Sequence, residues 1–314
     1  GTTEHGFVLF RTGSYFFITA GRMTGMKEKL NAIRNAALSE LEKIGTGEEL
    51  EQFRIRILGK KGELTAVLRG MGQISPEERP VIGQLANEVR AAIEAGMEEK
   101  LAAIREKAKE VCRRQIDAAA ILGIDCILVP PGTVGVDFRP EDVVPDTANV
   151  SFFAGSEVID YDVAYERSQA AFRELAPYAE RKNVIIGIEN IWNKFLLSPL
   201  EFRNFLDEIG SDYVAAFLDV GNMLMFGYPQ HWIKILNKRI KKVHFKDFRR
   251  DVQRLSGFVD LLAGDVDWPA VIKAFDDIGY DGWASAECCP NYKFYTNQIV
   301  YNSSAAMDCI LGRK

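Results

Sequence analysis

The stretch Val184-Ile185-Ile186-Gly187-Ile188-Glu189-Asn190 decides the fold class. β-Branched residues fill four of its first five positions, and the apolar run ends in a carboxylate. A short continuous apolar run of this kind is typical of a strand that is buried on both faces, as in parallel sheets. We therefore interpret residues 184–188 as a parallel strand that opens onto a site at its carboxyl end.

Three further apolar stretches downstream also end in a polar residue of the metal-ligand type. The stretches are 215–218, 242–243 and 283–286, and the residues that follow them are Asp219, His244 and Glu287. Each residue alone has a plainer reading as a turn or cap residue, a core histidine or an ion-pair partner. Because the carboxyl ends of parallel strands meet at one edge, the four together with Glu189 predict a single site.

From Gly123 onward, strand patterns alternate with helix patterns, which predicts a parallel α/β sheet. The expected strands are 126–129, 184–188, 215–218, 242–245 and 283–286, and the expected helices are 162–181, 199–209, 229–238, 267–278 and 302–311. Ligand-type residues at several strand ends favour a (β/α) TIM-type barrel over an open sheet. Only five βα units follow residue 110, whereas a closed barrel has eight, so the barrel is expected to be incomplete at its N-terminal side. The long loop over residues 130–157 is placed to act as a lid.

The N-terminal third of the chain has a helical texture. Residues 26–110 are rich in Ala, Leu, Glu, Lys and Arg, with apolar residues spaced three and four apart, and the motif SPEE at 75–78 has the features of a helix start. We predict an antiparallel coiled-coil arm that passes without a linker into a barrel domain over 111–314. Residues 1–25 are interpreted either as a short β-hairpin or as a leader sequence foreign to the fold.

Composition sets broad limits on the function. The 314 residues are 47% hydrophobic and 26% charged, and the net charge of −5 provides no overall basic field for nucleic acid. The five cysteines form no C-x-x-C pair, which indicates free thiols and a cytoplasmic location. No apolar run is long enough to span a membrane, and the N-terminal segment lacks the basic start of a secretory signal.

The chemistry of the predicted site follows from its donor atoms. Carboxylates with one imidazole suit a hard divalent cation, for which we expect Mn²⁺ first and Mg²⁺ or Co²⁺ as alternatives. Two open positions would accept the vicinal hydroxyl and carbonyl of a ketose, and the cation would stabilise the cis-enediolate formed when a carbon acid loses its proton. Glu189 and Glu287 would then act as the acid/base pair, while Asp219 and His244 hold metal and substrate.

Four motifs carry a resemblance to a known family. They are IENIWNKF at 188–195, LDVGN at 218–222, VHFKD at 243–247 and AE at 286–287. With these motifs, residues 111–314 resemble the last five βα units of the xylose-isomerase-like TIM barrels, the sugar phosphate isomerase/epimerase superfamily. The resemblance implies a metal-dependent ketose isomerase or 3-epimerase in which Glu189 and Glu287 are both metal ligands and the acid/base pair, and Asp219 and His244 complete the metal shell.

The same resemblance points to substrate-side residues. Ketose 3-epimerases usually have a histidine three residues after the metal aspartate, whereas this chain has Asn222, so isomerisation and epimerisation both stay open. Arg250 matches a position used for substrate contact, and Lys246 and Arg249 would either meet a sugar phosphate or be solvated charges. AP endonucleases of this superfamily use a histidine-rich cluster of three zinc ions, which the three histidines of the whole chain cannot supply.

A second resemblance covers residues 26–108, through LGKKGELTA at 58–66 and SPEERP at 75–80. These residues resemble the N-terminal arm of the bacterial phenylalanyl-tRNA synthetase α subunit, a coiled coil that contacts tRNA. The resemblance implies a tRNA contact at Lys60 and Lys61, and it supports an alternative function, a non-catalytic fusion of a truncated barrel with a tRNA-binding or oligomerising coiled coil. Because an open sheet exposes its edges, we also expect a homo-oligomer.

Overall fold

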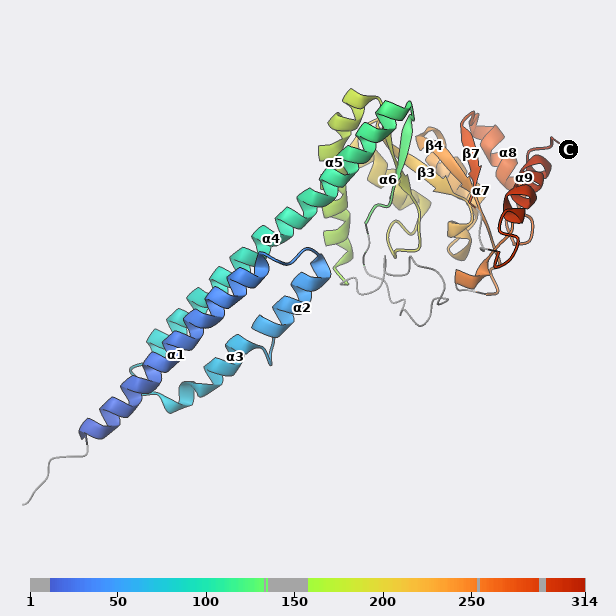
Figure 1. Ribbon diagram of the computed structural model, residues 1–314. Helices are drawn as coiled ribbons and strands as arrows, with labels where there is room; N and C mark the ends of the chain where they lie inside the picture. Colours follow the sequence, from blue (N-terminus) through green and yellow to red (C-terminus); the bar gives the residue numbers. More distant parts are fainter. Residues whose placement is uncertain (1–11, 133, 135–157, 253–254, 288–291, 314) are drawn as a thin grey trace, which may run out of the picture. The chain divides into compact units, whose positions relative to one another are not determined.

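The structure is a computed structural model that describes residues 12–132, 134, 158–252, 255–287 and 292–313 (Figure 1). The chain divides after Lys107 into two compact units, and each unit has its own hydrophobic core. None of the described helices is both long enough and apolar enough to cross a membrane. The described cysteines, Cys112, Cys126 and Cys309, are free thiols, and Cys288 and Cys289 lie outside the described residues.

The first unit is an arm of helices, as predicted. Its elements are α1 (Thr12–Leu41), α2 (Gly47–Leu58), α3 (Glu63–Leu68), the 3₁₀ turn η1 (Arg69–Gln73) and the first part of α4 (Arg79–Leu122). α2 and α3 run antiparallel to α4, whereas α1 runs in the same direction as α4 (Figure 1). The end of α1 packs on the middle of α4, because Nζ of Lys100 donates to O of Glu42 at 2.9 Å and a Cβ at Gly96 would lie 3.0 Å from Leu41.

Local signals explain where the arm's helices begin. Thr46 and Glu49 form a reciprocal capping box at the start of α2. At the predicted start of the long helix, Oε2 of Glu78 accepts a hydrogen bond from N of Ser75, and a turn over residues 76–78 leads into α4. The apolar positions of these helices then meet in one core, whose fully buried members include Leu30, Leu64, Ile82, Val89 and Ile93.

The β-hairpin alternative for residues 1–25 is wrong for the residues that the structure describes. Residues from Thr12 onward belong to α1, and residues 1–11 lie outside the described part of the chain. A lone two-stranded hairpin is marginally stable in water, whereas each residue added to an existing helix gains a backbone hydrogen bond. The alternative of a foreign leader sequence stays a prediction.

The second unit contains a curled, five-stranded parallel sheet with strand order β1-β2-β3-β4-β7, flanked by helices (Figure 1). The strands are β1 (Cys126–Val129), β2 (Ile185–Glu189), β3 (Val214–Asp219), β4 (Ile240–Phe245) and β7 (Trp283–Ala286). The helices that follow them in the chain are α5 (Tyr161–Lys182), α6 (Pro199–Ile209), α7 (Pro229–Leu236), α8 (Trp268–Ile278) and α9 (Gln298–Ile310). Every predicted strand is present, which confirms the barrel-type α/β fold.

The end of α4 belongs to the core of this second unit. Cys112, Ile116 and Ala119 are buried there, as expected for a helix that packs on a parallel sheet. On the surface, Nζ of Lys109 and a guanidinium nitrogen of Arg113 both pair with the carboxylate of Glu174 on α5. The helical pattern that continues past residue 110 in the sequence therefore corresponds to a helix that packs in the core of the second unit.

A small antiparallel pair, β5 (Asp247–Phe248) and β6 (Phe258–Val259), was not predicted. It is fixed by Asp247, which is fully buried and accepts hydrogen bonds from the backbone N of Phe248, Leu262 and Val266 and from Nε1 of Trp268. One buried carboxylate thus folds the segment after β4 back over the sheet and leads it into α8.

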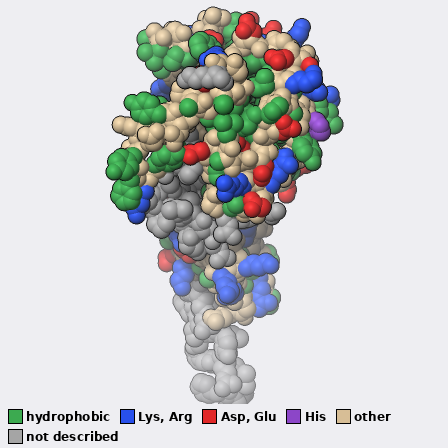
Figure 2. Space-filling model, turned by 90° about the vertical axis from the view of Figure 1, so that its right-hand side faces the viewer, with side chains coloured by type: hydrophobic (Ala, Val, Ile, Leu, Met, Phe, Trp, Pro, Cys, Tyr) green, Lys and Arg blue, Asp and Glu red, His purple; other side chains and the backbone are tan. Residues whose placement is uncertain are grey.

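The barrel is incomplete among the described residues, as predicted. β1 and β7 each pair with only one strand of the described sheet, so both edges are open there. Hydrophobic side chains gather on the face that carries β7 and α9 (Figure 2). The large exposed hydrophobic residues of this region are Trp283, Phe294, Tyr295, Val300 and Tyr301. The predicted lid falls almost entirely outside the described residues.

Candidate metal centre

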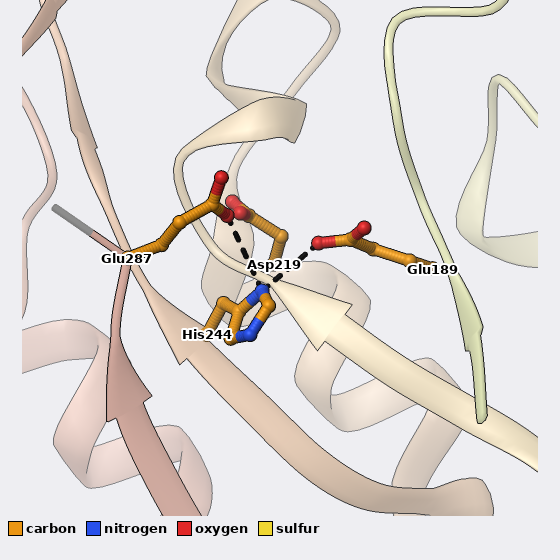
Figure 3. A group of neighbouring side chains, drawn as sticks. All are labelled: Glu189, Asp219, His244 and Glu287. Atoms are coloured by element: carbon orange, nitrogen blue, oxygen red, sulfur yellow. Dashed lines mark hydrogen bonds and ion pairs between the residues drawn. The ribbon is translucent and has the colours of Figure 1, made fainter. Parts of the chain in front are cut away.

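The parallel register brings the four predicted ligands to one edge of the sheet. Asp219 at the end of β3 pairs in register with His244 on β4. Glu189 ends β2 on one side of them, and Glu287 follows β7 on the other (Figure 3). One ligand atom from each residue lies within 4.8 Å of all the others, so four residues spread over about a hundred positions of sequence form one cluster.

His244 occupies the middle of the cluster. Its Nδ1 lies 2.9 Å from Oε1 of Glu189 and 3.2 Å from Oε2 of Glu287, and its ring contacts that of Phe217 at 4.5 Å between centroids. Burial alone would lower the pKa of His244, but the hydrogen bonds to the two glutamates outweigh burial and raise this pKa to about 9. In the metal-free protein His244 is therefore an imidazolium at neutral pH.

Among the described residues, hydrogen bonds hold the carboxylate of Asp219 at one of its two oxygens. Its Oδ1 accepts hydrogen bonds from the backbone N of Gly221 and Asn222, both at 2.8 Å. The side chain of Asn190 clamps the backbone of Asp219 from the neighbouring strand, with Nδ2 donating to O and Oδ1 accepting from N, both at 2.9 Å. Asp219 therefore begins a turn and also directs Oδ2 into the cluster.

Lys246 supplies a further positive charge at the cluster. Its Nζ lies 2.8 Å from Oε1 of Glu287 and 3.8 Å from Oδ2 of Asp219. Burial would raise the pKa of Glu287, but the hydrogen bond from His244 and the charge of Lys246 hold this pKa well below its usual range. For the fully buried Asp219, burial dominates over the attraction of Lys246 and raises the pKa.

The cluster fits a divalent cation. Within the described part of the chain, Oδ2 of Asp219 is buried and makes no hydrogen bond, and the buried Oε2 of Glu287 pairs with Nδ1 of His244 at 3.2 Å. Buried acceptors without a donor are costly, and in native proteins such groups call for an explanation such as an ion. Three carboxylates and one imidazole form the oxygen-rich donor set that Mg²⁺ and Mn²⁺ accept. Coordination by Nδ1 of His244 would require the loss of its proton.

The other predicted residues of the barrel lie beside this cluster or further from it. Asn222 is buried, and its Nδ2 donates to O of Asn190 at 2.9 Å. Lys246 is also buried and faces the cluster itself. Arg250 places its guanidinium 5.0 Å from the ring centroid of Tyr228, and Arg249 donates to O of Ala263. Their roles toward a substrate stay predictions.

The two lysines predicted to meet tRNA belong to the arm. Lys60 and Lys61 are exposed in the turn between α2 and α3. Gly62 follows them because a Cβ there would lie 2.7 Å from O of Ile57, which no side chain tolerates. The structure therefore presents both lysines on a tight turn of the first unit.

Sequence reasoning missed the groups that support the site. Asn190 holds the backbone of Asp219 through hydrogen bonds of its side chain. The sequence could have indicated this role through the position of Asn190, directly after the first ligand. Trp192 donates from Nε1 to O of Asn222 at 2.7 Å and packs on the ring of Phe258. Phe258 sits on the two-residue strand β6, which leaves no periodic pattern in the sequence.

Two family descriptions match the chain. Residues 82–304 match the family described as xylose isomerase-like TIM barrel. Residues 45–111 match the N-terminal domain of class II aminoacyl-tRNA synthetases. The chain is also 58% identical over 94 residues to the phenylalanine–tRNA ligase alpha subunit of Acetivibrio thermocellus, a match that covers 29% of this chain and 28% of that protein. The chain thus spans only about a quarter of the length of the curated relatives it matches.

Solved structures resemble the barrel unit. D-psicose 3-epimerase with D-tagatose from Clostridium cellulolyticum H10 superposes with a TM-score of 0.51 at 17% identity, over 72% of this chain and 82% of that chain. A xylose isomerase-like TIM barrel protein from Mycobacterium smegmatis in complex with magnesium gives a TM-score of 0.51 at 17% identity, over 66% of this chain and 68% of that chain. At these identities the likeness shows the fold.

Proposed function

Because the chain belongs to the family of xylose isomerase-like TIM barrels, we propose that it is a divalent-metal-dependent isomerase or epimerase of a sugar or sugar phosphate. The observation that carries the proposal is the cluster of Glu189, Asp219, His244 and Glu287, whose ligand atoms lie within 4.8 Å of one another. Oδ2 of Asp219 is buried and makes no hydrogen bond in the described part of the chain, which supports a cation there.

The proposed roles follow from the positions of the four side chains. All four would hold the ion, and a bound divalent cation supplies positive charge for the oxygens of a chelating sugar. Glu189 and Glu287 approach the cluster from opposite sides (Figure 3). One carboxylate would remove the proton next to the sugar carbonyl, which gives a cis-enediolate, and the other would return a proton.

The donor set supports Mn²⁺ or Mg²⁺, with Co²⁺ as a further candidate, because the ligands are carboxylate oxygens and a single imidazole nitrogen. The Mycobacterium smegmatis protein with the same fold was solved with magnesium. The C. cellulolyticum protein was solved with a ketose, D-tagatose, which supports a ketose as the first substrate to test. Both phosphorylated and unphosphorylated ketoses belong in that test.

The experiment is proton exchange in deuterated water. The full chain, supplied with each cation in turn, should incorporate deuterium into a ketose, at C1 for 1,2-isomerisation and at C3 for 3-epimerisation. Glu189→Gln and Glu287→Gln should abolish the exchange, whereas Glu166→Gln, an exposed glutamate of α5, should retain it. Absence of exchange with every cation and ketose, or full exchange in Glu189→Gln, would disprove the proposed activity.

A second candidate function is favoured by the arm. Its match to the synthetase N-terminal domain and the exposed turn with Lys60 and Lys61 support a contact with tRNA beside a non-catalytic barrel. Lys60→Ala/Lys61→Ala should then abolish a tRNA gel shift that the full chain produces, while Lys29→Ala, an exposed lysine of α1, should not. No shift with the full chain would leave the arm as a spacer or oligomerising element.

A further inference from the structure

We propose that Lys246 is a positioning residue that fixes the carboxylate of Glu287 so that its Oε2 faces the ligand cluster. This inference rests on the proposed function and deepens it, because it concerns how the same site is kept in the geometry that receives a cation. From the sequence, Lys246 was expected either to meet a sugar phosphate or to be a solvated charge; in the structure its side chain is only 9% exposed and faces the carboxylates.

Glu287 is the ligand that needs such help. Its side chain is 34% exposed, compared with 9% for Glu189, 0% for Asp219 and 18% for His244. It follows β7, an edge strand of the described sheet whose residues are at most half-buried. Packing therefore restrains Glu287 less than the other three ligands, and a carboxylate at this position needs a hydrogen-bond partner to hold its orientation.

Lys246 is itself well fixed. Its backbone is pressed against the turn after β3, since a Cβ at Gly221 would lie 2.7 Å from O of Lys246. Its Nζ lies 4.3 Å from the centroid of the Phe258 ring, close enough for a favourable cation–π contact. The ring of Phe258 is held in turn by an edge contact with Phe248 and a tilted contact with Trp192. The ammonium group therefore has a defined position from which to restrain its partner.

The contact divides the two oxygens of Glu287 between two tasks. Nζ of Lys246 lies 2.8 Å from Oε1, which fixes this oxygen. Oε2 is then buried and faces the cluster, where it lies 3.2 Å from Nδ1 of His244. The same division is seen at Asp219, where backbone groups hold Oδ1 and Oδ2 faces the cluster.

Positioning and simple charge repulsion predict opposite results when Lys246 is removed. If the ammonium acted only as a nearby positive charge, its loss would strengthen the binding of a divalent cation. If it positions Glu287, its loss frees a ligand and weakens binding, and the loss of such an outer partner typically costs about tenfold or more in metal affinity. The sign of the change therefore separates the two roles.

The experiment is calorimetric titration of the full-length, metal-free chain with Mn²⁺. Lys246→Met should bind Mn²⁺ about tenfold more weakly than the unaltered chain. Lys242→Met is the matched control, because Lys242 lies on β4 four residues before Lys246, and its Nζ pairs with Asp125 at 2.8 Å rather than with the cluster. Lys246→Gln is a second variant with the same expected result, for use if Lys246→Met fails to fold.

A double-mutant cycle tests whether Lys246 acts through Glu287. In the Glu287→Gln background, Lys246→Met should change Mn²⁺ affinity by less than about twofold, because the group that it positions is gone. Equal or tighter binding in Lys246→Met, or a tenfold loss that persists in the Glu287→Gln background, would overturn the inference and leave the proposed function intact. An unaltered chain that binds no divalent cation would instead overturn both.

Discussion

Binding of a divalent cation should release a proton from His244, and the structure sets the size of this effect. Hydrogen bonds to Glu189 and Glu287 overcome burial and raise the pKa of His244 from 6.5 to about 9. Coordination requires the neutral imidazole, so protons compete with the cation below pH 9. Each unit of pH below that value should weaken binding about tenfold, which makes affinity at pH 7 about a hundredfold weaker than above pH 9.

The assay is calorimetry at pH 7 in buffers of different ionisation enthalpy, which counts the protons released per ion bound. At least about one proton should appear, with any further fraction coming from Asp219, whose pKa burial also raises. His244→Gln should lower the count by about one, whereas His231→Gln, an exposed residue of α7, should leave it unchanged. Affinity that does not vary between pH 7 and pH 9, or an unchanged count in His244→Gln, would refute the assignment of His244 as a ligand.

Three further predictions concern stability. Because the pKa of His244 is raised, protonation of its ring stabilises the metal-free fold; this stabilisation is complete below pH 6.5 and is lost as pH rises to about 9. Thermal melts should therefore show that the free energy of unfolding declines by up to about 3 kcal/mol over this window, and His244→Gln should remove the decline. Asp247→Ala deletes the acceptor of four hydrogen bonds, three of them buried, and should cost at least about 3 kcal/mol in denaturant unfolding, and a loss below 1 kcal/mol would contradict its role. Ile93→Ala should destabilise the arm by about 2–5 kcal/mol without changing metal affinity, because Ile93 belongs to the arm's separate core, and a loss of metal binding would show that the units are coupled.

The strands and ligands could be predicted because their signals are local. A parallel strand buried on both faces is a continuous apolar run, and β3 shows the result, with all of Val214–Asp219 buried. A polar residue that ends such a run must lie at the carboxyl edge, so Glu189, Asp219, His244 and Glu287 could be grouped without any knowledge of their contacts.

The remaining features depend on contacts between distant segments. Lys246 was interpreted either as a phosphate contact or as a solvated charge, because nothing near it in the sequence shows that its ammonium group will lie over the ring of Phe258. β5 and β6 have two residues each and leave no period to detect. The start of α9 was placed at residue 302 instead of Gln298, since Val300 and Tyr301 are exposed and do not follow the expected pattern of burial. The arm's seam indicated an antiparallel partner but gave no sign that α1 runs in the same direction as α4.

The central claim is that the four strand-end residues form one site for a divalent cation. Equilibrium dialysis of the full chain against Mn²⁺ or Mg²⁺ at pH 8, followed by elemental analysis, tests it most directly. We predict about one ion per chain and its loss in Asp219→Asn, which keeps the oxygen that accepts from Gly221 and Asn222 but removes the carboxylate charge. A chain that retains no ion, or an Asp219→Asn variant that retains it with unchanged affinity, would contradict the account.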